Sequence, residues 1–248
     1  MPHTGLKLFV FGSSLTSSYW NGAATYYRGL YRELHRLGYS IVFAEPDIFQ
    51  RQQHRDREHA LDYADSRVYQ GRDQLQRLLR EAREADLIIK HSGVGEDDDW
   101  LEAAVLDTAA SAPGGARPRT AFWDVDAPAT LAALQANPLH PLRRLLPGYD
   151  YVFTYGGGPP VVTAYLKQGA RNCYPIYNAL DPETHQPAPP DPAWQADLGF
   201  LGHRLPDREA RVRRFFFETA ARLPQRQDRK STRLNSSHHT TSRMPSSA

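Results

Sequence analysis

Residues 6–14 are Leu-Lys-Leu-Phe-Val-Phe-Gly-Ser-Ser, a short apolar run that ends in a loop of small residues. A helical pattern follows, in which apolar side chains recur at spacings of three and four before Gly38: Ala24, Tyr27, Leu30, Tyr31, Leu34 and Leu37. A second apolar run occupies residues 41–44. Strand, loop, helix and strand in this order predict one βαβ unit with parallel strands. Ligands bind to such units at the carboxyl ends of the strands, so the loop at Gly12 should face any binding cleft.

The same alternation continues through the next 130 residues. Apolar runs predict further strands, at residues 86–90, 120–123, 151–155 and 173–177. Helical patterns lie between them, at residues 73–85, from near Asp97, behind Pro128, and from Val161 to Gly169. Residues 46–66 are polar, and we expect them to be an excursion over the surface. The alternation predicts an α/β fold with a mostly parallel sheet and flanking helices.

Composition excludes several classes of protein. Hydrophobic residues at 40% and charged residues at 23% of 248 residues are typical of a globular chain. No apolar run approaches the roughly 20 residues of a membrane-spanning helix, and the amino terminus lacks a signal-peptide pattern. We therefore expect no transmembrane segment and a cytoplasmic location. The net charge is only +2, so we expect no nucleic-acid partner. We expect the single cysteine, Cys173, to be an inert thiol in the core.

Proline marks a change in organisation. Residues 181–192 contain five prolines in twelve positions, which is typical of a stiff surface linker. We predict a first domain at residues 1–182, a linker at 183–195 and the start of a truncated second domain at 196–227. In that second part we expect a strand at 197–201 and a helix at 207–223. The buried side of this helix would carry Val212, Phe215, Phe216 and Leu223.

The last 21 residues have a different character. Nine of the eighteen residues from Ser231 onward are Ser or Thr, and no apolar periodicity remains. This composition predicts disorder over residues 228–248. Residues 228–238 also resemble translated sequencing-adapter DNA, so we expect an artefactual tail and a true reading frame that is lost near Gln227.

Four loops leave the carboxyl ends of the predicted strands and should open onto one edge of the sheet. Glycine there lets a ligand approach the backbone, and the helix amino termini offer N–H groups to an anion. The alternative for each loop is a tight turn into a helix. The candidate substrate-binding residues on these loops are Gly12, Ser13, Ser14, Asn21, Gly22, Ser92, Gly93, Gly156, Gly157 and Gly158.

Two carboxylates follow the strand at 120–123. Asp124 and Asp126 could serve as a general base, hold sugar hydroxyls or bind a divalent cation. Alternatively, Asp126 caps the next helix and Asp124 only fills a turn.

Other side chains near the predicted strand ends have two interpretations each. Tyr19 and Trp20 could stack on a sugar ring or pack over the sheet edge, and His91 is interpreted as a hydrogen-bonded core or rim residue. Arg204 and Arg208 could bind a diphosphate or belong to a solvated helix face.

Several short motifs together resemble the start of a CgeB-like (spore-maturation-type) glycosyltransferase with the GT-B arrangement. They are FGSS at 11–14 with NGAA at 21–24, FWDVDAP at 122–128, YGGGPP at 155–160, YNALDPET at 177–184 and LGFLG at 198–202. The resemblance implies two Rossmann-like domains that face a cleft, the first for a sugar-bearing or hydroxyl acceptor and the second for a nucleotide-sugar donor. Residues 178–181 resemble the Asn-Gly-Val-Asp stretch at the domain junction of related transferases.

In this hypothesis Asp124 or Asp126 orients or deprotonates the acceptor hydroxyl, the nucleotide sugar is a co-substrate, and no metal or other cofactor is required. The acidic donor-binding motif of such families has no counterpart here, so we expect this chain to be inactive alone. Two alternatives remain. One is a metal-dependent transferase in which residues 124–126 form an Asp-x-Asp motif, and the other is a non-enzymatic module that binds a carbohydrate or a partner.

Overall fold

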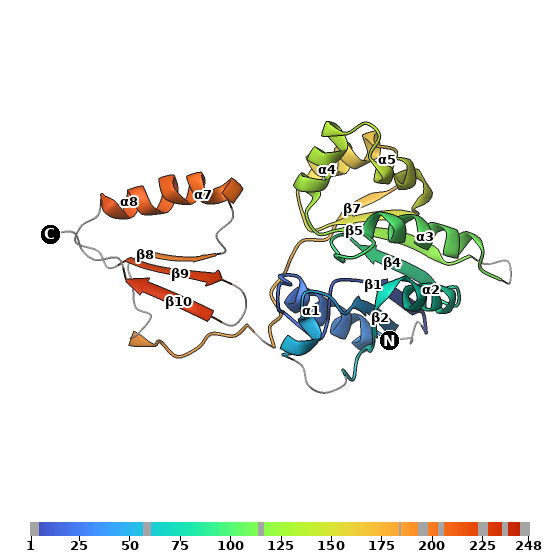
Figure 1. Cartoon of the computed structure of the whole chain (residues 1–248), viewed down its shortest axis with the longest axis horizontal. Helices are drawn as coiled ribbons and strands as arrows, with labels where there is room; N and C mark the ends of the chain where they lie inside the picture. Colours follow the sequence, from blue (N-terminus) through green and yellow to red (C-terminus); the bar gives the residue numbers. More distant parts are fainter. Residues whose placement is uncertain are drawn as a thin grey trace. The chain divides into compact units, whose positions relative to one another are not determined.

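A computed structural model describes residues 5–56, 61–113, 117–183, 185–192, 198–202, 206–222, 228–234 and 238–243 (Figure 1). The chain divides into two compact units, Met1–His185 and Gln186–Ala248, and each is described by itself. The division falls inside the proline-rich stretch of the sequence. Among the described residues, no helix is long and apolar enough to cross a membrane.

The first unit contains a seven-stranded, entirely parallel sheet in the order β3-β2-β1-β4-β5-β6-β7. This is an α/β, Rossmann-like arrangement, as the sequence predicted. Cys173, at the start of the edge strand β7, is a buried free thiol. The strands are β1 (Lys7–Phe11), β2 (Ser40–Pro46), β3 (Asp65–Tyr69), β4 (Leu87–His91), β5 (Arg119–Asp124), β6 (Tyr151–Thr154) and β7 (Cys173–Pro175).

Helices cover both faces of this sheet. Successive side chains of β1 point to opposite faces, so they show which helices pack on each face. Leu8 and Val10 pack in one core cluster with side chains of α1, whereas Phe9 and Phe11 pack in a second cluster with side chains of α2 to α6. The helices are α1 (Ala24–Arg36), α2 (Gly71–Ala82), α3 (Asp98–Ala110), α4 (Ala127–Ala136), α5 (Pro141–Leu145) and α6 (Gly158–Lys167), with short 3₁₀ turns η1 (Arg51–His54) and η2 (Leu146–Gly148).

The strand order reverses its direction at β1. The chain leaves β1 toward β2 and β3 and then returns through α2 to β4, which pairs with β1 on its other side. In open parallel sheets, ligands bind at the carboxyl ends of the strands where the order reverses in this way. The loops after β1 and β4 are therefore the first place to look for a site.

The expectation that residues 46–66 only cross the surface is wrong. β2 continues to Pro46, η1 follows, and β3 begins at Asp65. Arg51, Tyr63 and Ala64 are buried. β3 has no apolar run because it is an edge strand whose side chains are mostly exposed, and such strands often carry charged residues.

The second unit contains β8 (Leu198–Gly202), β9 (Asp228–Leu234) and β10 (His238–Arg243), with β8 parallel and β10 antiparallel to β9. A helical stretch runs through α7 (Pro206–Val212), a π-helical turn η4 (Arg213–Phe217) and α8 (Glu218–Ala221). Phe216 packs near Phe200, but Phe215 is 70% exposed, which contradicts its predicted burial. A π turn rotates the residues that follow it away from a 3.6-residue pattern. Leu223 lies outside the described residues.

The tail also differs from the expectation of disorder over residues 228–248. The structure places residues 228–234 and 238–243 in paired strands. Main-chain hydrogen bonds hold such a ladder and need no apolar side chains, and Thr is favourable in strands. The remaining residues of the tail lie outside the described part.

Candidate functional site

A cavity of about 610 Å³ lies at the carboxyl edge of the parallel sheet in the first unit. The loops after β1, β4, β5 and β6 all contribute to its wall, together with η1, the start of α1 and the segment after β7. The four loops therefore meet at one edge, as the parallel strands predicted. Six of the candidate residues line this cavity: Ser13, Asn21, Gly22, Ser92, Gly93 and Asp126.

The remaining candidates do not line the cavity. They are Gly12, Ser14, Asp124, Gly156, Gly157 and Gly158. Arg204 lies outside the described residues. Arg208 belongs to α7, but its side chain lies outside the described part of the structure.

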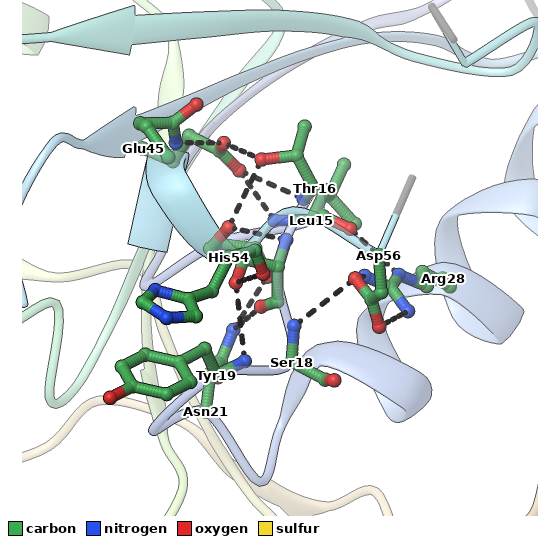
Figure 2. Close-up of polar contacts among 12 residues, drawn as sticks. Leu15, Thr16, Ser18, Tyr19, Asn21, Arg28, Glu45, His54 and Asp56 are labelled. Carbon is green, nitrogen blue, oxygen red and sulfur yellow. Dashed lines mark hydrogen bonds and ion pairs between the residues drawn. The ribbon is translucent and has the colours of Figure 1, made fainter. Parts of the chain in front are cut away.

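The loop after β1 is held by Glu45, a fully buried carboxylate near the end of β2 (Figure 2). Its oxygens accept hydrogen bonds from the backbone N–H of Leu15 at 2.5 Å and of Thr16 at 3.2 Å, and from the Thr16 hydroxyl. The Gln52 amide donates a further bond at 3.0 Å. Because Glu45 is buried and saturated, the loop has little freedom to rearrange.

Arg28 of α1 adds a second restraint on the same loop (Figure 2). Its Nε donates to the Leu15 carbonyl at 2.7 Å, and its two Nη atoms donate to Asp56 at 3.0 and 2.5 Å. Asn21 donates to the carbonyls of Ser14 at 2.7 Å and Ser17 at 3.1 Å, and it accepts from Ser13 Oγ at 2.8 Å. The loop is thus folded back on itself and fastened to both α1 and the segment after β2.

These restraints also engage the backbone donors of the loop between β1 and α1. The N–H groups of residues 15–19 all bond to side chains: those of Glu45, Ser14, Asp56 and Ser17. Gly12 is required by packing, because a Cβ atom there would lie 2.3 Å from Cζ of Phe43. Gly12 and Ser14 therefore build the loop and do not contact the cavity.

The glycines after β6 also have a structural role. Gly157 and Gly158 have φ angles of +87° and +55° at the start of α6, and a Cβ on Gly157 would lie 2.1 Å from Cγ2 of Val161. Residues 156–158 therefore form a tight turn, which was the alternative interpretation of this loop, and they do not line the cavity. Their neighbour Tyr155 is the residue of this loop that lines the cavity.

Asp124 is fully buried and does not face the cavity, which differs from the expected catalytic role. One of its oxygens accepts hydrogen bonds from Ser92 Oγ at 2.9 Å, the Asp126 N–H at 3.0 Å and Thr130 Oγ1 at 3.0 Å. The other oxygen accepts from the Tyr165 hydroxyl. Asp124 therefore joins the loops after β4 and β5 and fixes Ser92 at the cavity wall.

Asp126, in contrast, is exposed and lines the cavity. It occupies the residue before α4, but its side chain accepts no capping hydrogen bond. Its carboxylate has no hydrogen-bond or ion-pair partner among the described residues. Of the two predicted acids, Asp126 is the one that can meet a ligand.

Aromatic side chains form much of the remaining wall. Tyr26 and Tyr155 pack with their ring centroids 4.6 Å apart, and the exposed Trp20 lies at the rim. The buried Tyr26 hydroxyl has no hydrogen-bond partner in the described structure, and burial raises its pKa to about 12. Tyr19 instead stacks on His54 at 4.0 Å, so only Trp20 of the predicted aromatic pair reaches the cavity.

The segment after β7 closes one side of the cavity. Residues 178–180 and His185 line it. Asp181 is buried and accepts a hydrogen bond from Arg32 of α1 at 2.6 Å. A Cβ on Gly29 would lie 3.2 Å from Cβ of Asp181, so α1 carries a glycine where this segment crosses it.

Arg51 is the site residue that the sequence analysis missed. It is 4% exposed and lines the cavity. Its Nη1 donates to the carbonyls of Ser13 at 2.9 Å and Val94 at 3.4 Å, and its Nη2 donates to the Trp20 carbonyl at 3.2 Å. Burial lowers the pKa of Arg51, and the charge of Glu45 opposes this only in part. Arg51 lies in a polar stretch without hydrophobic periodicity, so nothing in the sequence pattern indicated that it is buried.

His91 ends β4 and is fully buried, as the interpretation of a hydrogen-bonded core residue predicted. Its Nε2 forms a hydrogen bond with the Tyr31 hydroxyl at 2.6 Å, and its ring stacks on Trp123 at 5.0 Å. Burial, with a smaller contribution from the charge of Lys90, lowers the pKa of His91 from 6.5 to about 3.

The shifted pKa of His91 predicts a loss of stability in acid. Between about pH 6.5 and pH 3 the unfolded chain binds a proton at this residue and the folded chain does not, so stability falls as the pH falls, by up to about 1.4 kcal/mol per pH unit. His91→Gln should flatten this decline, because glutamine can bond to Tyr31 and does not titrate. Urea unfolding at pH 4 and pH 7 measures the difference. Equal declines in the wild type and the variant would contradict the assignment.

Comparisons with known proteins add no family assignment to this geometry. No protein-family model matches the chain, and no curated protein matches it.

Proposed function

We propose that the first unit is the acceptor-binding domain of a glycosyltransferase with the GT-B arrangement. The observation that carries the proposal is the unpartnered, exposed carboxylate of Asp126 in a cavity with aromatic and polar walls. Trp20 and the tyrosines offer rings against which a sugar can pack, and Ser13, Asn21 and Ser92 offer hydrogen-bonding groups. The motif resemblance found in the sequence supports the same assignment.

The chemistry of this proposal assigns Asp126 the role of general base. Its carboxylate takes the proton from an acceptor hydroxyl as that oxygen bonds to the anomeric carbon of a nucleotide sugar. The bond from the anomeric carbon to the diphosphate oxygen breaks, and the nucleoside diphosphate leaves with the electron pair. Asp124 is a positioning residue in this scheme, because it holds Ser92 and the Asp126 backbone.

The β1–β2 region argues against a dinucleotide at the same edge. Dinucleotide-binding folds use an acidic residue after the second strand for the ribose and loop N–H groups for the pyrophosphate. Here the buried Glu45 and the N–H groups of residues 15–19 are all occupied within the protein. An acceptor that needs hydroxyl and ring contacts fits the free groups better than a nucleotide does.

The Asp-x-Asp metal hypothesis has less support from the geometry. Asp124 accepts four hydrogen bonds and is fully buried, so coordination of a cation would break bonds that hold the two loops. The carbohydrate-binding module remains the nearest alternative, since it would use the same cavity without a transfer step.

The test is saturation-transfer NMR on the whole chain with a panel of methyl glycosides. We expect at least one glycoside to receive saturation, and we expect Trp20→Ala to weaken its binding about three- to tenfold. The matched control is Leu139→Ala, which removes an exposed apolar side chain outside the cavity and should leave binding unchanged. Absence of binding by every glycoside, or displacement of the bound glycoside by uridine diphosphate, would refute an acceptor site.

A further inference from the structure

We infer that the acceptor is an acidic saccharide, whose carboxylate or phosphate oxygens bind the guanidinium of Arg51 while a hydroxyl elsewhere on the molecule meets Asp126. This inference rests on the proposed function and adds the chemical class of the acceptor.

The first argument is the charge of Arg51. Three cationic side chains are buried among the described residues: Arg28, Arg51 and Lys90. Arg28 is paired with Asp56, and Lys90 is paired with Asp98 and Glu102. Of these three, Arg51 alone makes no ion pair with a carboxylate in the described structure, and its hydrogen bonds go to three backbone carbonyls. A buried charge without a direct carboxylate partner is costly. Glu45 compensates Arg51 only in part, because its oxygens bond to Leu15, Thr16 and Gln52, and a ligand anion would supply the missing partner.

The second argument is the hydrogen-bonding capacity that Arg51 retains. A guanidinium carries five N–H donors, and the three carbonyl bonds use only Nη1 and Nη2. The buried Nε has no hydrogen-bond partner in the described structure. Because Nε is buried, the contact open to a carboxylate or phosphate oxygen in this conformation is the second N–H of Nη2. The carbonyls that hold Arg51 also fix the plane of the guanidinium.

The third argument concerns the spacing of the charges. Arg51 follows β2 and Asp126 follows β5, and these strands are separated by β1 and β4. The Arg51 side chain reaches back over the sheet edge, because its guanidinium bonds to Ser13 after β1 and to Val94 after β4. The cation and the Asp126 carboxylate therefore occupy separate places on the wall of one cavity. An acidic group beside the reacting hydroxyl would be repelled by Asp126, whereas an acidic group elsewhere on the molecule can meet Arg51.

Isothermal titration of the whole chain tests this inference with three probes: methyl glucuronide, glucose 6-phosphate and methyl glucoside. We expect at least one acidic probe to bind ten or more times as tightly as the neutral glucoside, with an affinity that falls as salt is added. Tight binding of only the glucuronide or only the phosphate would identify which oxyanion the site takes.

Variants then assign the preference to Arg51. Arg51→Gln should reduce the affinity for the acidic probe to that for the glucoside, whereas Arg51→Lys should keep part of the preference because it keeps the charge. The matched control is Arg55→Gln, which removes an exposed charge from the same stretch, outside the cavity lining, and should leave the preference unchanged. If Arg51→Gln does not fold, as judged by circular dichroism, the comparison of Arg51→Lys with Arg55→Gln decides.

The outcomes separate this inference from the proposed function. Equal affinity for the acidic and neutral probes would overturn the acidic acceptor and leave a neutral acceptor site in place. A preference that survives in both Arg51 variants would also overturn the role of Arg51. Failure of all three probes, together with failure of the glycoside panel, would overturn the proposed function itself.

Discussion

Replacement of Lys90 by alanine is expected to lower the free energy of unfolding by about 3–5 kcal/mol. Lys90 lies on β4, has no exposed surface, and donates to Asp98 at 2.6 Å and to Glu102 at 3.2 Å. Without the ammonium group, the mostly buried Glu102 loses its partner, and burial already raises the pKa of this carboxyl. Asp98 also accepts from the N–H groups of Val94 and Gly95, so the loop after β4 should loosen as well.

Urea denaturation, with the midpoint and slope fitted separately, measures the effect of Lys90→Ala. The matched control is Lys7→Ala, because Lys7 is half-exposed and lies 3.9 Å from an exposed Glu84. Such surface pairs contribute little, so the control should change stability by less than about 1 kcal/mol. The double variant Lys90→Met with Glu102→Met should recover part of the loss, since it removes both charges. A Lys90→Ala protein as stable as the control would contradict this account of the buried cluster.

Asp124→Ala should cost about 2–4 kcal/mol of stability and disturb the cavity wall. The substitution leaves the buried Tyr165 hydroxyl without its acceptor, and it removes the acceptor shared by Ser92, Thr130 and the Asp126 N–H. Asp124→Asn should lose less, because its amide oxygen can still accept the bonds from Ser92 and the backbone. The expected order of stability is wild type, then Asn, then Ala, measured by urea denaturation.

Glycoside binding provides a second measurement for the Asp124 variants. Because Asp124 fixes Ser92 but does not touch the cavity, Asp124→Asn should retain binding while Asp124→Ala weakens it. The comparison variant is Asp126→Asn, which should keep wild-type stability, since the Asp126 carboxylate has no partner among the described residues. An Asp124→Asn protein that is fully stable but binds no glycoside would restore the original expectation that Asp124 contacts the ligand.

The parallel sheet was predictable because its strands are buried on both faces. A strand such as β1 is apolar at nearly every position, and the helix that follows shows a clear 3.6-residue period. β3 was missed because an edge strand with exposed side chains has no such run. Phe215 was misplaced because a π-helical turn cannot be recognised from hydrophobic spacing.

The location of the site followed from topology, but the roles of its residues did not. Because the carboxyl ends of parallel strands lie at one edge, the sequence alone assigns four loops to a common cavity. The hypothesis from the sequence named both Asp124 and Asp126. It could not identify Asp124 as the buried one, because β5 is buried on both faces and strand alternation then says nothing about burial. The burial of Arg51 could not be predicted from the sequence either. It depends on contacts with residues far away in the sequence, such as Ser13 and Val94.

The place of β1 in the sheet has a consequence for synthesis of the protein on the ribosome. β1 emerges before the other strands of this parallel sheet, yet its neighbours are β2 and β4, and β4 ends only at His91. One edge of β1 therefore has no pairing strand until about 80 further residues have left the exit tunnel. The apolar residues on this strand are Leu8, Phe9, Val10 and Phe11. At 5–20 residues per second this interval lasts about 4–16 seconds. Such an apolar open edge is a ready target for chaperones, so a nascent chain stalled before residue 87 should be the form that they hold most tightly.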